Sequence, residues 1–287
     1  MYEKFLDTLV LELELRGRSS KTILIYKTEV LRFLNFYSKP IDQVSIPDIK
    51  QYQLNLIKEG FSPKTINMRM AAVRFFCLNV LEKNWIQMFS PRVKETTTPP
   101  SILTPGEVAA VMSQAGNFKE RLILMMLYST GIRSFELTEF CIEDINRAEG
   151  LLKIKGKNKK IRYVPLPNEL LKEFENYWRT HIKPRRSGLF FCKNNEFPEV
   201  MNTTEVYKIF ITAMRRTGIN KKGGAHLLRH SFATRMLELG VSLREIQIIL
   251  GHSQLRTTEI YTHLRTVRIQ TLPNPLTSII SQLKLVG

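Results

Sequence analysis

The segment from Pro91 to Pro100 limits the possible folds of this chain more than any other feature, because its sequence PRVKETTTPP holds almost no large apolar side chain. Its closing proline pair resists a helix and favours an extended backbone. The length of 287 residues also favours two domains. We therefore predict a linker at residues 91–101, between a first domain at 1–90 and a second that begins at 102.

The first domain has the pattern of a small helical bundle. Its apolar residues recur at helical spacing in four blocks, at about residues 2–16, 20–37, 46–58 and 63–82. Serines lie at the starts of three blocks and prolines lie in two first turns, at Ser20, Ser45, Ser62, Pro47 and Pro63. These residue types are common at such positions, because the N–H groups at a helix start have no partner within the helix.

The second domain mixes helical patterns with one hairpin. Thr104 and Glu107 have the spacing of a capping box, and a strongly apolar helix is expected around 122–128. Short β-prone runs then flank a turn at 156–158. Helical patterns resume at residues 167–181, 202–217, 226–239, 242–250 and 256–263. We therefore predict a mainly α fold with a small β-sheet or hairpin, in which a helical domain precedes a mixed α/β domain.

The net charge of the chain indicates a polyanionic partner. Lysine and arginine number 43 against 26 aspartates and glutamates, which gives a formal net charge of +17 in a chain that is 43% hydrophobic. Nucleic acid is the first candidate for the partner of such a basic globular protein. A membrane surface is the alternative, but we find no apolar run of about 18 residues and no secretory signal. We expect a soluble cytoplasmic protein without a membrane partner.

Basic side chains crowd the predicted hairpin, where they would repel one another on an isolated ribbon. A phosphate backbone alongside would relieve this repulsion, and a solvated basic hairpin is the alternative. The side chains expected to contact DNA are Lys153, Lys155, Lys159, Lys160 and Arg162.

Two short motifs place arginines where they could hold a phosphate. Arg133 lies just after a glycine, and Glu136, one turn further on, could hold its guanidinium in place; an ordinary surface ion pair is the alternative. His226 and Arg229 lie on one helix face and can point at one anion. His230 adds a zinc-like spacing, but no acidic or third ligand accompanies it, and the cysteines lack metal-ligand spacing, so we expect no metal.

Tyr261 is the candidate nucleophile. It lies in the stretch LGHSQLRTTEIYTH, which begins at Leu250 and contains His252. A lone tyrosine at a helix end usually has a buried ring and a hydrated hydroxyl. Here, histidines and an arginine that could surround a phosphate precede the tyrosine in a strongly basic protein. This combination suggests a tyrosine that attacks DNA.

Together these motifs closely resemble those of the tyrosine recombinases, the phage-integrase and Xer-like site-specific recombinases. The resemblance runs from the first domain, which is similar to the family's core-binding domain, to Tyr261. It rests on the ordered motifs Gly131-x-Arg133-x-x-Glu136-Leu137, Gly156-Lys157 with Arg162-x-Val164-Pro165-Leu166, His226-x-x-Arg229-His230, and Leu250-Gly251-His252 with Thr258-x-x-Tyr261. It implies a core-binding domain at 1–90, a catalytic domain at 102–265 and a C-terminal tail at 266–287.

The resemblance implies cleavage and rejoining of DNA strands without ATP, metal or cofactor. Tyr261 would form a 3′-phosphotyrosyl bond, His226 would accept its proton, and Lys157 would protonate the departing 5′ oxygen. Two arginines and a second histidine would bind the phosphate, and Glu136 would support the first arginine. The implied catalytic residues are Arg133, Lys157, His226, Arg229, His252 and Tyr261.

The implied partner is a double-stranded DNA recombination site. A homotetramer would join two such sites and exchange strands through a Holliday junction. Prolines at 273 and 275 interrupt the tail, so a short amphipathic helix is expected beyond them, with apolar residues Ile279, Ile280, Leu283 and Leu285. In the family such tails often dock on a neighbouring protomer, and packing on its own domain is the alternative.

Two other functions stay open. A type IB topoisomerase shares the arginine, lysine, histidine and tyrosine chemistry. The motifs here, however, have the residue types and spacings of the recombinases. A catalytically inactive DNA-binding relative would keep the fold, although every implied catalytic position is filled. Among recombinases, the compact length favours a simple Xer or mobile-element type.

Overall fold

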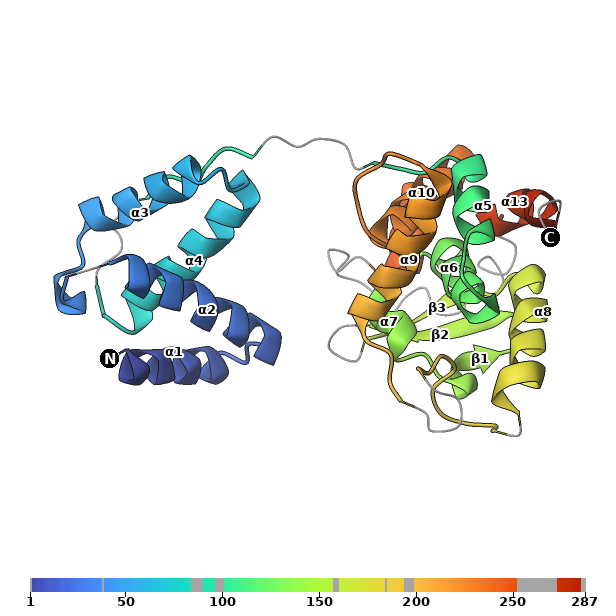
Figure 1. The fold of residues 1–287 in the computed structure, drawn as a ribbon. Helices are drawn as coiled ribbons and strands as arrows, with labels where there is room; N and C mark the ends of the chain where they lie inside the picture. The colour runs from blue at the N-terminus through green and yellow to red at the C-terminus, as the bar shows by residue number, and fades with distance from the viewer. Residues whose placement is uncertain are drawn as a thin grey trace. The chain divides into compact units, whose positions relative to one another are not determined.

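The computed structural model describes residues 2–37, 39–83, 90–95, 101–156, 160–183, 185–193, 199–251 and 273–284. The chain divides into two compact units, residues 1–98 and 99–287 (Figure 1). Each unit has its own hydrophobic core, as expected for separate domains. Among the described residues, no helix is long and apolar enough to cross a bilayer.

The described part of the first unit is a helical bundle. Its elements are α1 (Glu3–Leu15), α2 (Ser20–Phe36), a 3-10 turn (Ile41–Gln43), α3 (Ile46–Lys58) and α4 (Pro63–Asn79). Serine N-caps stabilise the starts of two of these helices. The hydroxyls of Ser19 and Ser62 accept N–H groups from the first turns of α2 and α4. The four predicted helices are confirmed, although Ser19 rather than Ser20 caps α2, and α4 ends at Asn79 rather than at residue 82.

The first part of the predicted linker is attached to the first unit. Nε2 of Gln53, on α3, donates a hydrogen bond to the carbonyl of Pro91 at 2.7 Å. Asn67, on α4, binds both the carbonyl and the N–H of Val93, at 2.9 Å each. Residues 91–95 therefore extend the body of the first unit.

The second unit combines helices with one small sheet. Its helical elements are α5 (Pro105–Ser113), α6 (Phe118–Thr130), α7 (Ser134–Thr138), the 3-10 helix η3 (Ile142–Asp144), α8 (Asn168–Tyr177), the π-helix η5 (Trp178–Ile182), α9 (Thr203–Thr217), α10 (His226–Glu238), α11 (Leu243–Leu250) and α13 (Pro275–Lys284). Its strands are β1 (Ile145–Asn146), β2 (Leu151–Lys155) and β3 (Ile161–Pro165). The predicted helices are confirmed wherever they are described, whereas the pattern at 256–263 lies outside the described residues.

Helix α6 is the centre of the second unit (Figure 1). Every residue from Leu122 to Thr130 is buried, as expected for a helix that is apolar on all sides. Helices α5, α8, α10 and α13 all contact it. The end of α6 is therefore held in place from several directions, and this end leads directly into the first arginine motif.

The sheet has the strand order β1-β2-β3 and is antiparallel. The predicted hairpin is confirmed, with Ile154 opposite Arg162 and Lys153 opposite Tyr163. Side chains alternate between the two faces of a sheet, so Arg162 shares a face with the buried Ile154 and Val164. Lys153 lies on the opposite face. The alternation thus separates basic side chains that were expected to form one DNA-contacting set.

Helix α13 closes the core of the second unit. Its start is fixed by Asn274, whose side chain donates to the Ser129 carbonyl at 2.7 Å and accepts from the Leu276 N–H at 2.9 Å. Leu276 and Ile279 have no exposed surface, and α13 contacts α5, α6, α8 and α10. The predicted helix in the tail is confirmed, although it begins at Pro275 itself rather than beyond both prolines, and in the single chain it packs on its own unit.

We expect Ile279→Ala to lower the free energy of unfolding by about 2 to 5 kcal/mol, because it leaves a cavity in the core. The matched control is Ile280→Ala, which removes the same atoms from a partly buried position. Denaturant unfolding of both variants without DNA measures the difference. Small and equal losses would indicate that α13 leaves this position in solution, as docking on a neighbouring protomer requires.

Candidate active site

The turn after α6 brings the first arginine motif close to α10 and α11. Gly131 ends α6 with a left-handed φ of 61°. A Cβ at this position would lie 2.5 Å from Cδ1 of Phe232 on α10 and 2.7 Å from Cδ2 of Leu250 on α11. Only glycine permits both the backbone conformation and this close approach. Arg133 follows as the N-cap of α7.

Glu136 holds Arg133 as the sequence spacing predicts. Oε2 of Glu136 accepts the backbone N–H of Arg133 at 2.7 Å, and Oε1 accepts an N–H from Nη1 of Arg133 at 3.2 Å. The side chain of Glu136 has no exposed surface, whereas 29% of the Arg133 side chain is exposed. The carboxylate therefore anchors the arginine within the protein and leaves part of the arginine accessible.

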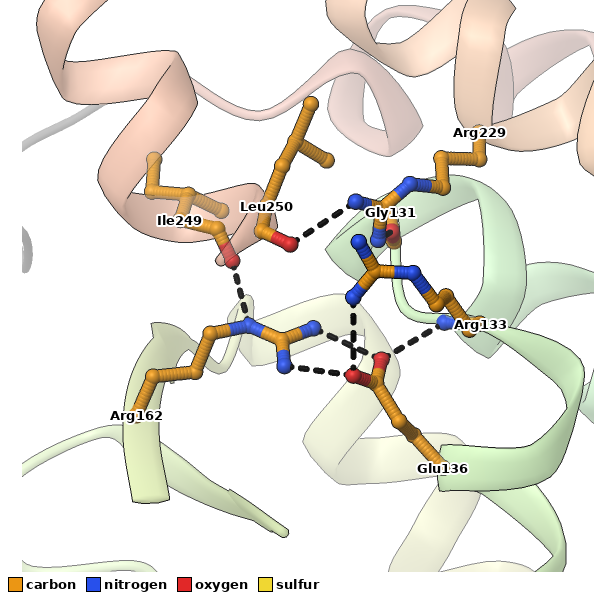
Figure 2. A network of polar contacts seen from close by, with 7 residues as sticks. All are labelled: Gly131, Arg133, Glu136, Arg162, Arg229, Ile249 and Leu250. Carbon is orange, nitrogen blue, oxygen red and sulfur yellow. Dashed lines mark hydrogen bonds and ion pairs between the residues drawn. The ribbon is translucent and has the colours of Figure 1, made fainter. Parts of the chain in front are cut away.

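Arg229, on α10, is buried and joins the ends of two other helices. Its Nη1 donates to the Gly131 carbonyl at 2.6 Å, and its Nη2 donates to the Leu250 carbonyl at 2.7 Å (Figure 2). Carbonyls at a helix C-terminus lack intrahelical partners and carry partial negative charge, so a guanidinium suits them. Arg229 therefore fixes the ends of α6 and α11 beside each other.

Three guanidinium groups and one carboxylate form what we call the arginine cluster, defined as Arg133, Arg162, Arg229 and Glu136. Glu136 pairs with Arg133 and Arg162, and Arg229 binds the two helix ends beside them. Arg162 donates to both oxygens of Glu136 at 2.7 Å each (Figure 2). Burial and the nearby Arg133 lower the pKa of Arg229 to about 9, and Glu136 opposes this shift. Arg229 is still cationic at neutral pH. The cluster therefore has an excess of positive charge, which an anion such as a phosphodiester would offset.

His226 begins α10, one turn before Arg229, and is exposed. Desolvation by the surrounding protein atoms, and then the charges of Arg229, His230 and Arg133, lower the pKa of His226 below its ordinary value of 6.5. The lowered pKa favours the neutral imidazole at pH 7, which is the form that accepts a proton. This state fits the role of proton acceptor that the family resemblance implies.

The described basic residues of the hairpin differ in their partners. Arg162 makes three hydrogen bonds inside the protein, through Nε, Nη1 and Nη2. Lys155 contacts Asp144 at 3.0 Å, and this hydrogen bond raises the pKa of Lys155. Lys153 is partly exposed and Lys160 is exposed. A contact between DNA and these lysines stays a prediction.

Four predicted site residues lie outside the described residues, namely Lys157, Lys159, His252 and Tyr261. The glycines that precede these segments are described. A Cβ on Gly156 would lie 3.6 Å from Oε1 of Glu136, and a Cβ on Gly251 would lie 3.0 Å from Cδ of Arg162. Both glycines therefore lie at the edge of the arginine cluster.

Glu136→Gln is expected to destabilise the protein most at neutral pH and less in acid. Burial raises the pKa of Glu136, but the hydrogen bonds and charges of Arg162 and Arg133 outweigh burial and hold the pKa below the usual 4.5. A depressed pKa contributes stability above pH 4.5 that is lost as the pH falls through the folded-state value. We expect a loss of about 1.5 to 3 kcal/mol at pH 7 for each charge-assisted hydrogen bond removed.

Unfolding free energies of the wild type and of Glu136→Gln, measured from pH 7 to below pH 4.5, test this expectation. The difference between the two proteins should narrow in the acid part of this range, because protonation removes the charge from the wild-type carboxylate. A difference that stays constant with pH would contradict the linkage.

Family models match both units of the chain. Residues 102–268 match the phage integrase family, and residues 5–87 match the N-terminal SAM-like domain of phage integrases. The chain is 33% identical over 260 residues to tyrosine recombinase XerA of Pyrococcus horikoshii, which covers 90% of this chain and 88% of that protein. It is 28% identical over 294 residues to tyrosine recombinase XerD of Vibrio cholerae, with 96% and 95% covered.

The fold is also that of solved integrases. A lambda integrase dimer bound to a COC' core site is similar with a TM-score of 0.70 and 19% identity, over 93% of this chain and 77% of that chain. The family that the sequence motifs indicated is thus confirmed by matches over both units. The chain therefore belongs to the phage integrase family and is a site-specific tyrosine recombinase of the Xer type.

Proposed function

We propose that this recombinase cleaves and rejoins DNA strands at the arginine cluster, with Tyr261 as the nucleophile and a 3′-phosphotyrosyl bond as the intermediate. The charge of the cluster supports this proposal, because its three arginines are accompanied by one carboxylate, that of Glu136, which pairs with Arg133 and Arg162. A phosphodiester brings negative charge to such a site. The charge on its non-bridging oxygens has to be stabilised while the tyrosine oxygen attacks.

Arg133 and Arg229 are assigned to the non-bridging oxygens. In its contacts with described residues, Arg229 donates two N–H groups, one to the Gly131 carbonyl and one to the Leu250 carbonyl. A guanidinium carries five N–H groups, and its fork geometry suits phosphate. In many phosphoryl-transfer sites Mg²⁺ stabilises this charge. With two arginines assigned to the same task, the proposed reaction needs no metal ion.

Proton transfer is assigned to the remaining motif residues. A free tyrosine has a pKa of about 10, so Tyr261 needs a proton acceptor at neutral pH. The neutral His226 suits this role, Lys157 would give a proton to the leaving 5′ oxygen, and His252 would donate to the phosphate. The phosphotyrosyl bond conserves the ester, so a 5′ hydroxyl can reverse the step without ATP.

The proposed assembly is a homotetramer on two double-stranded recombination sites. A lambda integrase tetramer bound to a Holliday junction has a similar fold, with a TM-score of 0.68 and 20% identity over 90% of this chain and 79% of that chain. The formal net charge of +17 also supports DNA as the partner. We place the reaction in the cytoplasm, on chromosomal or mobile-element DNA.

Covalent capture tests the proposed function. A library of duplexes with random sequence and a nick near the centre is incubated with the protein, and adducts that survive denaturing gel electrophoresis are sequenced. After cleavage the short fragment beside the nick diffuses away, so rejoining fails and the adduct accumulates. We expect capture on one sequence class, and equal capture in the presence of EDTA.

Each alternative gives a different capture result. A topoisomerase would be trapped on many unrelated sequences, and an inactive DNA-binding relative would be trapped on none. Loss of the adduct in EDTA that a divalent cation restores would contradict the proposed metal-free chemistry.

A further inference from the structure

Arg162 differs from the other described basic residues of the hairpin because its hydrogen bonds connect separate parts of the second unit. From β3, its Nη1 and Nη2 each donate to Glu136 at 2.7 Å, and its Nε donates to the carbonyl of Ile249 at 2.7 Å (Figure 2). Only 11% of its side chain is exposed. A planar guanidinium can reach a carboxylate and a carbonyl at once, which a lysine cannot do with the same geometry.

The three connected segments each lead to a residue of the proposed reaction. Glu136 holds Arg133 on α7. Ile249 lies in the last turn of α11, just ahead of His252. Strand β3, which carries Arg162 itself, follows Lys157 closely in the sequence. One side chain therefore links the arginine motif, the second histidine motif and the lysine hairpin.

The packing around Gly251 supports this connection. Gly251 ends α11 with a φ of +65°, and a Cβ there would lie 3.0 Å from Cδ and 3.2 Å from Nε of Arg162. The backbone ahead of His252 thus rests directly on the Arg162 side chain. Any shift of that side chain would therefore affect the backbone at Gly251, the last described residue before His252.

We propose that Arg162 is a positioning residue, which fixes the Glu136 carboxylate against Arg133 and fixes the end of α11 without contacting DNA. This inference rests on the proposed cleavage at the arginine cluster. Active sites depend on such support, because a displacement of about 1 Å can slow a reaction about a hundredfold. Glu136 has no exposed side-chain surface and has two arginines as partners, so loss of Arg162 leaves it with Arg133 alone.

The test compares Arg162→Gln, Arg162→Lys and the control Arg185→Gln on the nicked duplex captured by the wild type. Arg185 is a half-buried arginine of the same unit that donates to the Leu189 carbonyl at 2.7 Å and contacts Cys192, and both of these partners lie outside the arginine cluster. At saturating DNA and below the melting temperature of each variant, we expect Arg162→Gln to slow adduct formation about a hundredfold. Arg162→Lys should regain part of the rate, and Arg185→Gln should cleave normally.

Two further measurements separate positioning from a direct DNA contact. The dissociation constant for DNA and its dependence on salt should stay unchanged in Arg162→Gln, whereas loss of a phosphate contact would weaken binding and reduce the salt slope by about one. Hydrogen exchange of peptides that cover residues 249–251 should become faster in Arg162→Gln and stay unchanged in the control.

The pH profile of cleavage gives a readout that a general loss of stability would not produce. Arg162 lowers the pKa of Glu136, so its removal should make cleavage fall off at a higher pH on the acid side. In a Glu136→Gln background, Arg162→Gln should cause no such change, because the titrating group is absent.

Several outcomes would overturn the inference. These are a normal cleavage rate in Arg162→Gln, a reduced salt slope, or a lowered melting temperature with unchanged cleavage, pH profile and hydrogen exchange. If the wild type forms no adduct on any DNA, the proposed function itself fails. A normal wild-type adduct combined with any of the first three outcomes rejects only the role of Arg162.

Discussion

Replacing Tyr261 with phenylalanine is expected to abolish the covalent protein–DNA adduct while DNA binding stays close to that of the wild type. The substitution removes only the hydroxyl oxygen that would bond to the phosphorus atom, and the cationic groups that bind the phosphate remain. The loss should be complete, because no second step can bypass the missing bond. Denaturing gels of the captured duplex measure the adduct, and native gels measure binding.

Tyr207→Phe is the matched control for this experiment. Tyr207 lies on α9, and 49% of its surface is exposed. Removing its hydroxyl should leave adduct formation unchanged. A covalent adduct formed by Tyr261→Phe would contradict the assignment of Tyr261 as the nucleophile. Another residue would then have to be the nucleophile.

Arg229→Lys and Arg133→Ala are each expected to slow cleavage by at least about a hundredfold, the usual scale for losing a group that stabilises an oxyanion. For Arg229 the conservative variant is the better choice. A lysine keeps the positive charge but cannot donate to the Gly131 and Leu250 carbonyls while also holding two phosphate oxygens. Single-turnover cleavage of the captured duplex, below the melting temperature of each variant, measures the rate.

The control for Arg229 lies on the same helix. Arg235, on α10, pairs with Glu238 at 3.0 Å, and 29% of its side chain is exposed. Arg235→Lys keeps the charge and should leave the cleavage rate nearly unchanged. Near-normal cleavage by Arg229→Lys would show that the Arg229 guanidinium is not required at the phosphate. Its role would then be limited to its hydrogen bonds with the ends of α6 and α11.

Interactions between neighbouring residues could be predicted from the sequence because their partners are only a few positions apart. The capping box of α5 is an example, since Glu107 accepts the Thr104 N–H at 2.7 Å and Thr104 accepts the Glu107 N–H at 3.3 Å. The contact between Glu136 and Arg133 follows from the same short spacing. Strand β1 was not predicted, because a strand of two residues is too short for an alternating pattern.

The order of the motifs likewise identified the family, because residue types at fixed spacings can be read directly from the chain. The sequence could not indicate which main-chain carbonyls would accept from the arginines. Every residue has such a carbonyl, and Arg229 donates to one that lies 98 positions earlier, at Gly131. Only the packing of α6 against α10 creates this contact.

The hairpin also shows what the local sequence pattern predicts and what tertiary packing decides. Alternation along the strands places Lys153 and Arg162 on opposite faces, but the pattern does not say which face α11 covers. The structure places α11 against β3, so Arg162 turns toward Glu136 and the Ile249 carbonyl instead of toward solvent. The sequence thus determined the elements and the family through local spacing, whereas tertiary packing decided the partners of each buried charge, because those partners come from distant segments.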